Sequence, residues 1–416
     1  MRFIHAADVH IDSPLVGLRA YNDAPAEQLR NATRDAFTEL VTLAIDEQVD
    51  FIVIAGDLYD GTWPDFSTGL YFCGQMGRLN QANIPVYVLF GNHDAESEMT
   101  LKLKLPPNVH TFSAKKPETH LVDDLKLALH GRSFKTKAVT ENLVTGYPAP
   151  VPGYVNIGVL HTALEGSAAH ANYAPCTIEE LHAKGYDYWA LGHVHEYWMS
   201  SGRSTIVFPG NLQGRNIREV GRRGAVMVTV DDDRQVSVER LFIDVLRWES
   251  LVVDVSACES LEEVSAAVSV RLEELMSEDA HVPRAVRVTV RGESAAHGEL
   301  FGLESHLRAN ILAAMAALNH DKLWLEKVKV ETTAPSSPVN DSGSADAMAA
   351  LRQLLAEADQ DPELAKQISA LLLPLCQKAP EVLPHVPALE AVRQGDVSAV
   401  IRDVAPALLA RLAQAE

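Results

Sequence analysis

Five short segments in the first half of the chain each stop at side chains that commonly bind metal ions. Four of them are apolar runs, over residues 3–7, 51–55, 86–90 and 155–160, and the fifth covers residues 186–191. The residues that follow them are Asp8 and His10, then Asp57, then Asn92, His93 and Asp94, then His161, and finally His193 and His195. A short apolar run that ends at polar residues predicts a buried strand, and α/β sheets place ligands just beyond the carboxyl ends of such strands. The sequence therefore predicts an α/β fold with a polar site along the edge where these strands end.

Seven of these side chains are potential metal ligands with nitrogen or oxygen donors: Asp8, His10, Asp57, Asn92, His161, His193 and His195. Seven donors are too many for one tetrahedral zinc ion. They suit two metal ions about 3.5–4 Å apart, an arrangement that clamps a phosphoester during displacement at phosphorus. Asp57 stands alone after its run and is the natural bridging carboxylate. Imidazoles favour Mn, Fe, Zn or Ni, and the carboxylates and the amide keep the site hard enough for Mn²⁺.

Several residues near these ligands have more than one possible role. His93 follows the ligand Asn92, so it can face the substrate and donate a proton to the leaving oxygen. Asp94 can orient His93 for that step, or it can cap the helix that follows. Arg215 is a candidate substrate contact because arginine binds phosphate, although a solvated turn explains it equally well. The same two interpretations apply to Arg218, Arg222 and Arg223, and Glu219 is expected to be an ion-pair partner. Any single ligand candidate, taken alone, is also a common turn former, helix cap or core histidine.

The five motifs are DxH, GD, GNHD, a lone histidine and GHxH, in that order along the chain. In this order they resemble the calcineurin-like metallophosphoesterase superfamily. The resemblance implies an α/β fold built as a two-sheet metallophosphoesterase sandwich with flanking helices. It also implies two metal sites: Asp8, His10, Asp57 and His195 hold one ion, and Asp57, Asn92, His161 and His193 hold the other. In this scheme His93 is the general acid.

Three longer segments are similar to one branch of that superfamily, the Mre11/SbcD nucleases, and within it to the bacterial YhaO family of DNA repair exonucleases. They are residues 1–18, GDLYDGTWPD at 56–65 and PGNLQGRNIREVGRRG at 209–224. The branch implies an Mn²⁺-dependent DNA exonuclease that acts with an SMC/Rad50-like ATPase subunit and forms a homodimer. Nucleases of the Mre11 type often carry a histidine three residues after the bridging aspartate, where this chain has Asp60. A second catalytic histidine is therefore left open.

The formal net charge of −20 at first argues against a nuclease, because DNA-binding surfaces are basic. Two divalent ions would add about four positive charges where the phosphate must lie. Part of the acidity also lies outside the catalytic segment, since residues 341–416 carry 11 Asp and Glu against 6 Lys and Arg. Tight binding of duplex DNA would therefore need a basic surface on a partner subunit.

The 416 residues are expected to form two or three domains. Apolar spacing predicts helices over 26–47 and 65–80, and further strands over 126–130, 204–208, 225–230 and 235–242. These elements make up a catalytic domain, 1–240. Strands over 251–255, 285–291 and 323–330 alternate with helices over 261–276 and 299–317, which predicts a small α+β domain, 241–331. Its position in the chain is similar to that of the capping domain of Mre11-type nucleases, which implies a capping domain. A linker, 332–346, leads to a helical C-terminal region, 347–416, that either packs on itself or docks a partner.

Three functions are compatible with these patterns. The leading one is a metal-dependent DNA exonuclease or phosphodiesterase. The alternative keeps the same fold and hydrolyses small phosphodiesters or phosphoproteins. A scaffold that binds without hydrolysis is the third, and the presence of His93 argues against it. Four scattered cysteines without CxxC spacing, and the lack of an apolar run long enough to cross a bilayer, favour a cytoplasmic protein without a membrane partner.

Overall fold

The computed structural model describes residues 1–15, 26–61, 66–96, 104–164, 173–278, 281–300, 304–317 and 322–333, together with residue 335 and parts of 350–408. The chain divides into two compact units. The first comprises Met1–Glu249 with His281–Ala285, and the second comprises Ser250–Ala280 with Val286–Glu416.

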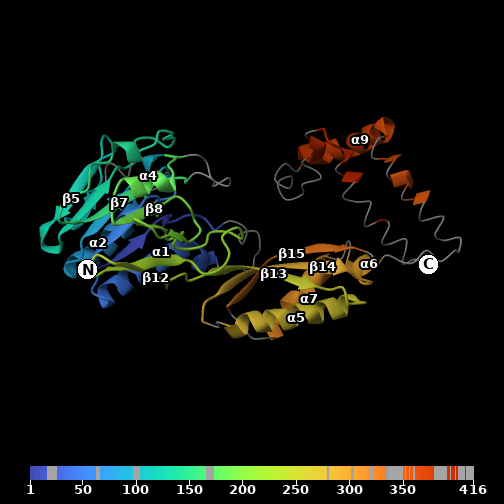
Figure 1. Ribbon diagram of the computed structural model, residues 1–416. Coiled ribbons are helices and arrows are strands. Elements are labelled where there is room, and N and C mark those ends of the chain that lie inside the picture. Colours follow the sequence, from blue (N-terminus) through green and yellow to red (C-terminus); the bar gives the residue numbers. More distant parts are fainter. Residues whose placement is uncertain are drawn as a thin grey trace. The chain divides into compact units, whose positions relative to one another are not determined.

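The first unit contains two six-stranded sheets (Figure 1). One of them has the strand order β12-β11-β1-β2-β3-β4. Its strands are β1 (Arg2–Ala6), β2 (Phe51–Ala55), β3 (Val86–Leu89), β4 (Val109–Thr111), β11 (Gly224–Val230) and β12 (Val236–Phe242). Strands β1 to β4 are parallel, whereas β11 pairs antiparallel with both β1 and β12. Helices α1 (Ala26–Asp46) and α2 (Ser67–Gln81) join the first three strands, close to the predicted ranges.

The second sheet has the order β5-β6-β7-β8-β10-β9. Its strands are β5 (Glu118–Val122), β6 (Leu127–Gly131), β7 (Val155–His161), β8 (Tyr188–Gly192), β9 (Trp198–Ser200) and β10 (Thr205–Phe208). The four inner strands are parallel, and the two edge strands are antiparallel to their neighbours. Helix α4 (Ile178–Ala183) precedes β8 and begins with a capping box between Thr177 and Glu180. Single 3₁₀ turns lie at η1 (Asp94–Glu96), η2 (Asp123–Leu125) and η3 (Val144–Gly146).

The two sheets pack against each other through one buried apolar cluster. In this cluster the Phe3 ring of β1 stacks on Phe51 of β2 at 4.6 Å and meets Tyr188 of β8 edge-on at 5.6 Å. Successive strand residues point to opposite faces, so Ile4 packs instead with Phe37 of α1 on the outer face. This arrangement confirms the expected two-sheet sandwich with flanking helices.

Three edge strands, β4, β5 and β9, and the short helix α4 were not predicted from the sequence. Two of these strands have three residues, and none has a fully buried residue. Strands this short and this polar carry too little periodicity to be read from the sequence.

The second unit begins with a three-stranded sheet of order β13-β14-β15. Its elements are β13 (Arg247–Asp254), α5 (Leu261–Glu278), β14 (Arg284–Glu293), α6 (His297–Leu300), α7 (Glu304–Ala317) and β15 (Leu323–Thr333). These strands and helices lie close to the predicted ranges, except that the helix expected over 299–317 consists of α6 and α7. The domain bounds 241–331 stay a prediction. Buried and exposed side chains do not alternate regularly along β15. One reason is that Glu326 is buried, where both of its carboxylate oxygens accept hydrogen bonds from Arg287 of β14.

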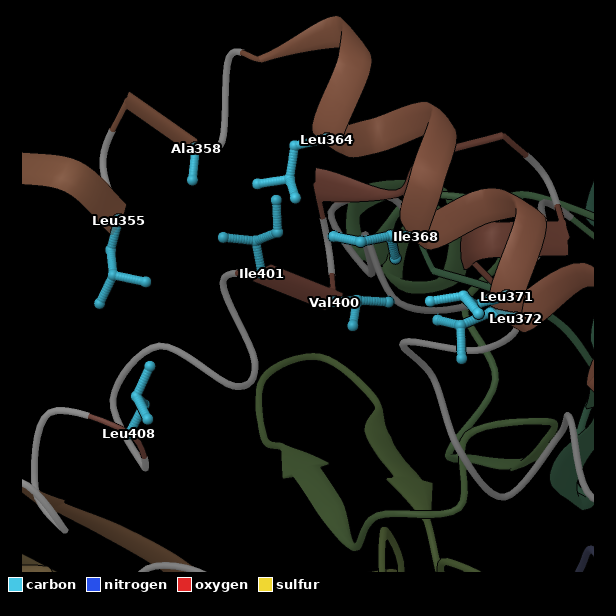
Figure 2. Close-up of a pocket in the computed structure, with 9 residues that line it drawn as sticks. All are labelled: Leu355, Ala358, Leu364, Ile368, Leu371, Leu372, Val400, Ile401 and Leu408. Atoms are coloured by element: carbon cyan, nitrogen blue, oxygen red, sulfur yellow. The ribbon is translucent and has the colours of Figure 1, made fainter.

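In the C-terminal region the structure describes helix α9 (Pro362–Lys378), which contains Pro374. Most of the predicted linker, 332–346, lies outside the described residues. Apolar side chains of α9 and of neighbouring segments line a cavity of about 310 Å³ (Figure 2). The lining residues are Leu355, Ala358, Leu364, Ile368, Leu371, Leu372, Val400, Ile401 and Leu408. Among the described residues, no helix has the length and apolar character needed to cross a membrane.

Candidate metal centre

The five predicted strand ends meet at one edge of the sandwich. Strands β1, β2 and β3 of one sheet and β7 and β8 of the other run parallel within their sheets and end in the ligand motifs. The loops are sharply bent: Asp8, His10, Asp57 and His193 all have positive φ, between 47° and 102°. Such backbone conformations are unfavourable for residues with a side chain and cluster at functional sites. Packing requires a glycine at the start of the GNHD motif, since a Cβ on Gly91 would lie 2.4 Å from Asp57 Oδ1.

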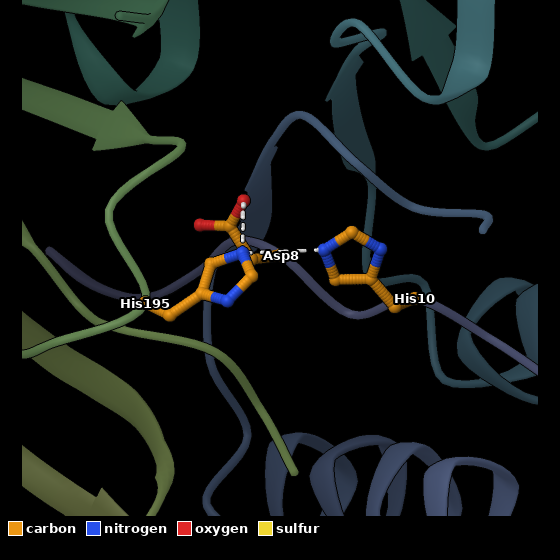
Figure 3. Close-up of side chains that lie close together, drawn as sticks. All are labelled: Asp8, His10 and His195. Atoms are coloured by element: carbon orange, nitrogen blue, oxygen red, sulfur yellow. Dashed lines mark hydrogen bonds and ion pairs between the residues drawn. The ribbon is translucent and has the colours of Figure 1, made fainter. Parts of the chain in front are cut away.

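The predicted ligands gather in two groups, and a third group of close donor atoms, His10, Asp60 and His93, shares His10 with the first. Asp8, His10 and His195 form the first, and their arrangement is shown in Figure 3. In it His195 Nε2 lies 3.8 Å from Asp8 Oδ1 and 3.4 Å from His10 Nε2. Asp57, His161 and His193 form the second group. Within each group the potential ligand atoms lie within 4.8 Å of one another.

Asp57 lies between the two groups. Its Oδ2 is 3.4 Å from His161 Nε2 and 4.0 Å from His10 Nε2. Its other oxygen, Oδ1, accepts a hydrogen bond of 3.0 Å from the backbone N–H of His93. Asn92 completes the second group, with its Oδ1 3.0 Å from His161 Nε2. The carboxylate expected to bridge two ions therefore has one oxygen fixed by the backbone and the other facing both groups.

Three histidines present the same ring nitrogen to this centre. The Nδ1 atom of His161 lies 2.9 Å from the carbonyl oxygen of Ala55. The Nδ1 atom of His195 lies 2.8 Å from Glu219 Oε1, and that of His10 lies 3.2 Å from Asp60 Oδ1. In His161 and His195 the acceptor favours the proton on Nδ1, whereas the contact of His10 Nδ1 with Asp60 lacks hydrogen-bond geometry. In His161 and His195 the lone pair of Nε2 then faces the centre, which is how metal-binding histidines are oriented.

The electrostatics of the centre suit cations. Burial lowers the pKa of His161, but the Asp57 and Asp8 carboxylates outweigh it and raise the pKa to about 9. The negative potential that would hold a proton on His161 would equally attract a divalent ion. Asp8 and Asp57 are almost fully buried, and buried carboxylates need charge compensation. The donor set thus fits two divalent ions, with every predicted ligand at the centre; the assignment of each ligand to an ion stays a prediction.

The predicted acid, His93, lies at the rim of the centre with 35% of its side chain exposed. Its ring meets that of His10 edge-on at 5.0 Å, and its Nδ1 is 3.5 Å from Asp60 Oδ1. Asp94 has other contacts: its buried carboxylate accepts the backbone N–H groups of Leu58, Tyr59 and Gly91. The carboxylate beside His93 is therefore that of Asp60, which sequence reasoning treated only as a departure from a pattern.

Arg215 lies next to Asp60 and Glu219, the carboxylates closest to the Nδ1 atoms of His10 and His195. Its Nη1 is 3.4 Å from Asp60 Oδ1, and its Nη2 is 3.3 Å from Glu219 Oε1. Glu219 also accepts the backbone N–H of Arg215 at 2.7 Å. Hydrogen bonds with His195 and the charge of Arg215 hold the pKa of Glu219 well below its usual range, against the opposing effect of burial. Arg215, predicted to contact substrate, thus connects two carboxylates of the site, and only 16% of its side chain is exposed.

Comparisons with known proteins agree with this geometry. Residues 1–197 match the family described as calcineurin-like phosphoesterase, and residues 248–333 match the middle domain of metallophosphoesterase YhaO. The chain is 34% identical over 297 residues to an uncharacterized metallophosphoesterase YhaO from Bacillus subtilis, a match that covers 70% of this chain and 72% of that protein. The chain belongs to the YhaO family of calcineurin-like metallophosphoesterases. It is therefore a metallophosphoesterase, a hydrolase with a His/Asp dimetal site, as the motifs predicted.

Similarity of this YhaO-family chain to Mre11 is more distant. A DNA double-strand break repair protein Mre11 from Methanopyrus kandleri is 27% identical over 284 residues, covering 62% of this chain and 60% of that protein. A crystal structure of a dimetal phosphatase from Danio rerio matches 58% of this chain and 96% of its own, with 11% identity and a TM-score of 0.38. The predicted membership of the YhaO family is confirmed, and the predicted resemblance to Mre11 is present as a distant similarity.

Proposed function

We propose that the chain hydrolyses phosphodiester bonds of DNA, as an exonuclease that uses Mn²⁺ and acts in DNA repair. The observation that carries this proposal is the shared-carboxylate centre with His93 at its exposed rim, in a chain whose similarity to a DNA repair protein spans 284 residues. That span is longer than the 197 residues matched to the catalytic family. The similarity is therefore not confined to the motifs that all phosphoesterases of this fold share.

The residues around the centre have separate tasks in this reaction. Asp8, His10, Asp57 and His195 would hold one divalent ion, and Asp57, Asn92, His161 and His193 the other. When bound, the two ions supply the positive charge that neutralises the phosphate and activates water. His93 gives a proton from Nε2 to the leaving oxygen, because its Nδ1 faces Asp60. Asp60 keeps the His93 ring in place, since its Oδ1 lies 3.5 Å from His93 Nδ1.

The substrate class is tested by comparing hydrolysis of four compounds with Mn²⁺: single-stranded DNA, duplex DNA, bis(p-nitrophenyl) phosphate and a cyclic nucleotide. We expect DNA to have the highest kcat/KM and to be shortened from its ends. Asp57→Asn serves as the control, because loss of the bridging carboxylate should abolish turnover of every substrate. A preference for the cyclic nucleotide over both DNA substrates would instead establish the small-substrate alternative.

We further propose that the C-terminal region docks an SMC/Rad50-like ATPase subunit and that the chain forms a homodimer. Support comes from the apolar cavity beside α9, whose lining residue Leu371 is 76% exposed (Figure 2). Large apolar side chains left exposed in this way are typical of interaction sites. A partner subunit would also supply the basic surface that a chain with a net charge of −20 needs for duplex DNA.

Co-expression with an SMC/Rad50-like ATPase encoded in the same genome tests this docking. Leu371→Glu should prevent co-purification, because it places a charge in the apolar cavity. The matched control is Gln367→Glu, an added charge at an exposed position of the same helix. Equal recovery of the ATPase with both variants would rule out docking at this cavity. Sedimentation of the parent chain alone measures whether a dimer forms.

A further inference from the structure

A row of alternating arginines and aromatic rings lies on the surface of the first unit. Its four members are Tyr197, Arg240, Phe242 and Arg222, named here the arginine–aromatic ladder. The Arg240 guanidinium carbon lies 4.4 Å from the ring centre of Tyr197 and 4.7 Å from that of Phe242. The Arg222 guanidinium lies 5.0 Å from the Phe242 ring centre. Both arginines are exposed, and Phe242 is 43% exposed.

The ladder lies at the end of the sheet where the metal-ligand loops begin. Phe242, the last residue of the edge strand β12, is paired with Gly224, the first residue of β11. Since β11 is antiparallel to β1, Gly224 lies toward the end of β1, where Asp8 follows. Backbone hydrogen bonds join Gly224 to Asn211, and Leu212 to Asp8. Tyr197 connects to the centre by a second route, because it stands two residues after His195.

The charge of this part of the chain differs from that of the whole. Residues 203–223 contain five arginines and one glutamate, in a chain with a net charge of −20. Two of these arginines have internal roles. Arg215 joins Asp60 and Glu219, and Arg223, which is 4% exposed, binds the carbonyl oxygen of His195 and the carboxylate of Glu196. The Arg222 side chain is exposed and lies over the Phe242 ring of the ladder.

Stacked guanidinium groups are well suited to bind a phosphodiester chain. Contact with an aromatic ring uses the flat face of the guanidinium and leaves the N–H groups at its edge able to bind phosphate oxygens. Surfaces that bind single-stranded nucleic acids also combine positive charges with aromatic faces. Resting on Phe242 and Tyr197 limits the motion of the arginine side chains, so less rotamer entropy is lost on binding.

We infer that the arginine–aromatic ladder binds single-stranded DNA adjoining the scissile bond. This inference rests on the proposed function, since it extends the substrate site away from the metal centre. Arg222 and Arg240 each contact a phosphate, and the exposed part of Phe242 contacts a base. If the ladder only covered the edge of the core between the sheets, its two aromatic rings would be explained. Its two exposed arginines would not be needed for that role.

The inference is tested with the full chain and a fluorescent, phosphorothioate-linked single-stranded oligothymidylate. We expect the double variant Arg222→Gln/Arg240→Gln to raise the Kd about tenfold. The slope of log K against log salt should become shallower by about 1.4, which is 0.7 for each of two phosphates on a single strand. The variant Arg222→Lys/Arg240→Lys keeps both charges but loses the planar stacked group, so it should retain most of the slope and bind less tightly than the parent.

Arg234→Gln is the matched control. It removes an exposed arginine at the turn between β11 and β12, at the opposite end of that hairpin from Phe242. This control should bind and cleave as the parent does, and thermal melting of every variant checks that the fold is retained.

If the parent cleaves oligonucleotides and the double variant has an unchanged Kd and salt slope, the inference about the ladder is overturned, and the proposed function is left intact. If the double variant bound only blunt duplex DNA less tightly than the parent, the inference about single-stranded DNA would also be overturned. A parent that hydrolyses only bis(p-nitrophenyl) phosphate would overturn both.

Discussion

At the scale of single residues, His93 is the group whose chemistry is most directly testable. In His93→Ala we expect two bound metal ions per chain, because the backbone N–H that holds Asp57 is retained. The kcat for DNA should fall by about 10²–10⁴, the usual contribution of a general acid. Bis(p-nitrophenyl) phosphate should lose much less, since nitrophenolate leaves without being protonated. An equal loss on both substrates would show that His93 does not act as the acid.

Arg215 has two possible roles, which metal affinity and KM distinguish: it positions carboxylates of the site, or it contacts the substrate. If it holds Asp60 and Glu219 in place, Arg215→Met should weaken metal binding about 10–100-fold, the range typical of residues that orient ligands. Isothermal titration with Mn²⁺ measures this directly. If it contacts substrate instead, KM rises and the affinity for metal stays at the parent value. Arg218→Met, at an exposed neighbouring position, is the control for loss of charge alone.

At the scale of elements, the end of β8 controls how closely the two sheets approach. A Cβ on Gly192 would lie 2.0 Å from the backbone carbonyl oxygen of Ala55 in β2, an atom that cannot move without shifting the strand. We expect Gly192→Ala to lower the free energy of unfolding by about 1–3 kcal/mol, as overpacking does, measured by urea denaturation. Gly74→Ala in α2 is the control: its Cβ would meet nothing within 4 Å, and it should stabilise the chain by up to about 1 kcal/mol. Equal stability of the two variants would contradict this account of the GHxH glycine.

How well a strand could be predicted from the sequence depends on how deeply it is buried. β2 and β8 are buried along their whole length, so each appears as an unbroken apolar run that stops at its ligand. β5, with a half-buried ETHLV sequence, has no such pattern. The role of Asp60 was hidden for another reason: its three neighbours His10, His93 and Arg215 come from distant parts of the chain. The contacts of Asp94 with backbone N–H groups are likewise unreadable from motifs, since any residue type supplies such a group.

At the scale of the whole molecule, the two compact units differ in whether they contain the metal centre. Every predicted ligand belongs to the unit that comprises Met1–Glu249, and the unit that begins at Ser250 has its own apolar core. Ligands stabilise only the part of a protein to which they bind. We therefore expect two calorimetric transitions, of which only one depends on metal. For each site filled at a Mn²⁺ concentration one hundred times its Kd, that transition should gain about 2.7 kcal/mol, or roughly 5–10 °C in Tm.

The same experiment tests whether the Asp57 carboxylate serves both metal sites. In Asp57→Asn the shared carboxylate is lost, so addition of Mn²⁺ should raise the first transition by at most half of the parent's gain. The transition of the second unit should remain at one temperature in the parent, in the variant and after treatment with EDTA. If it moved together with the first, the two units would unfold as one, and metal binding would stabilise the chain beyond the unit that carries the ligands.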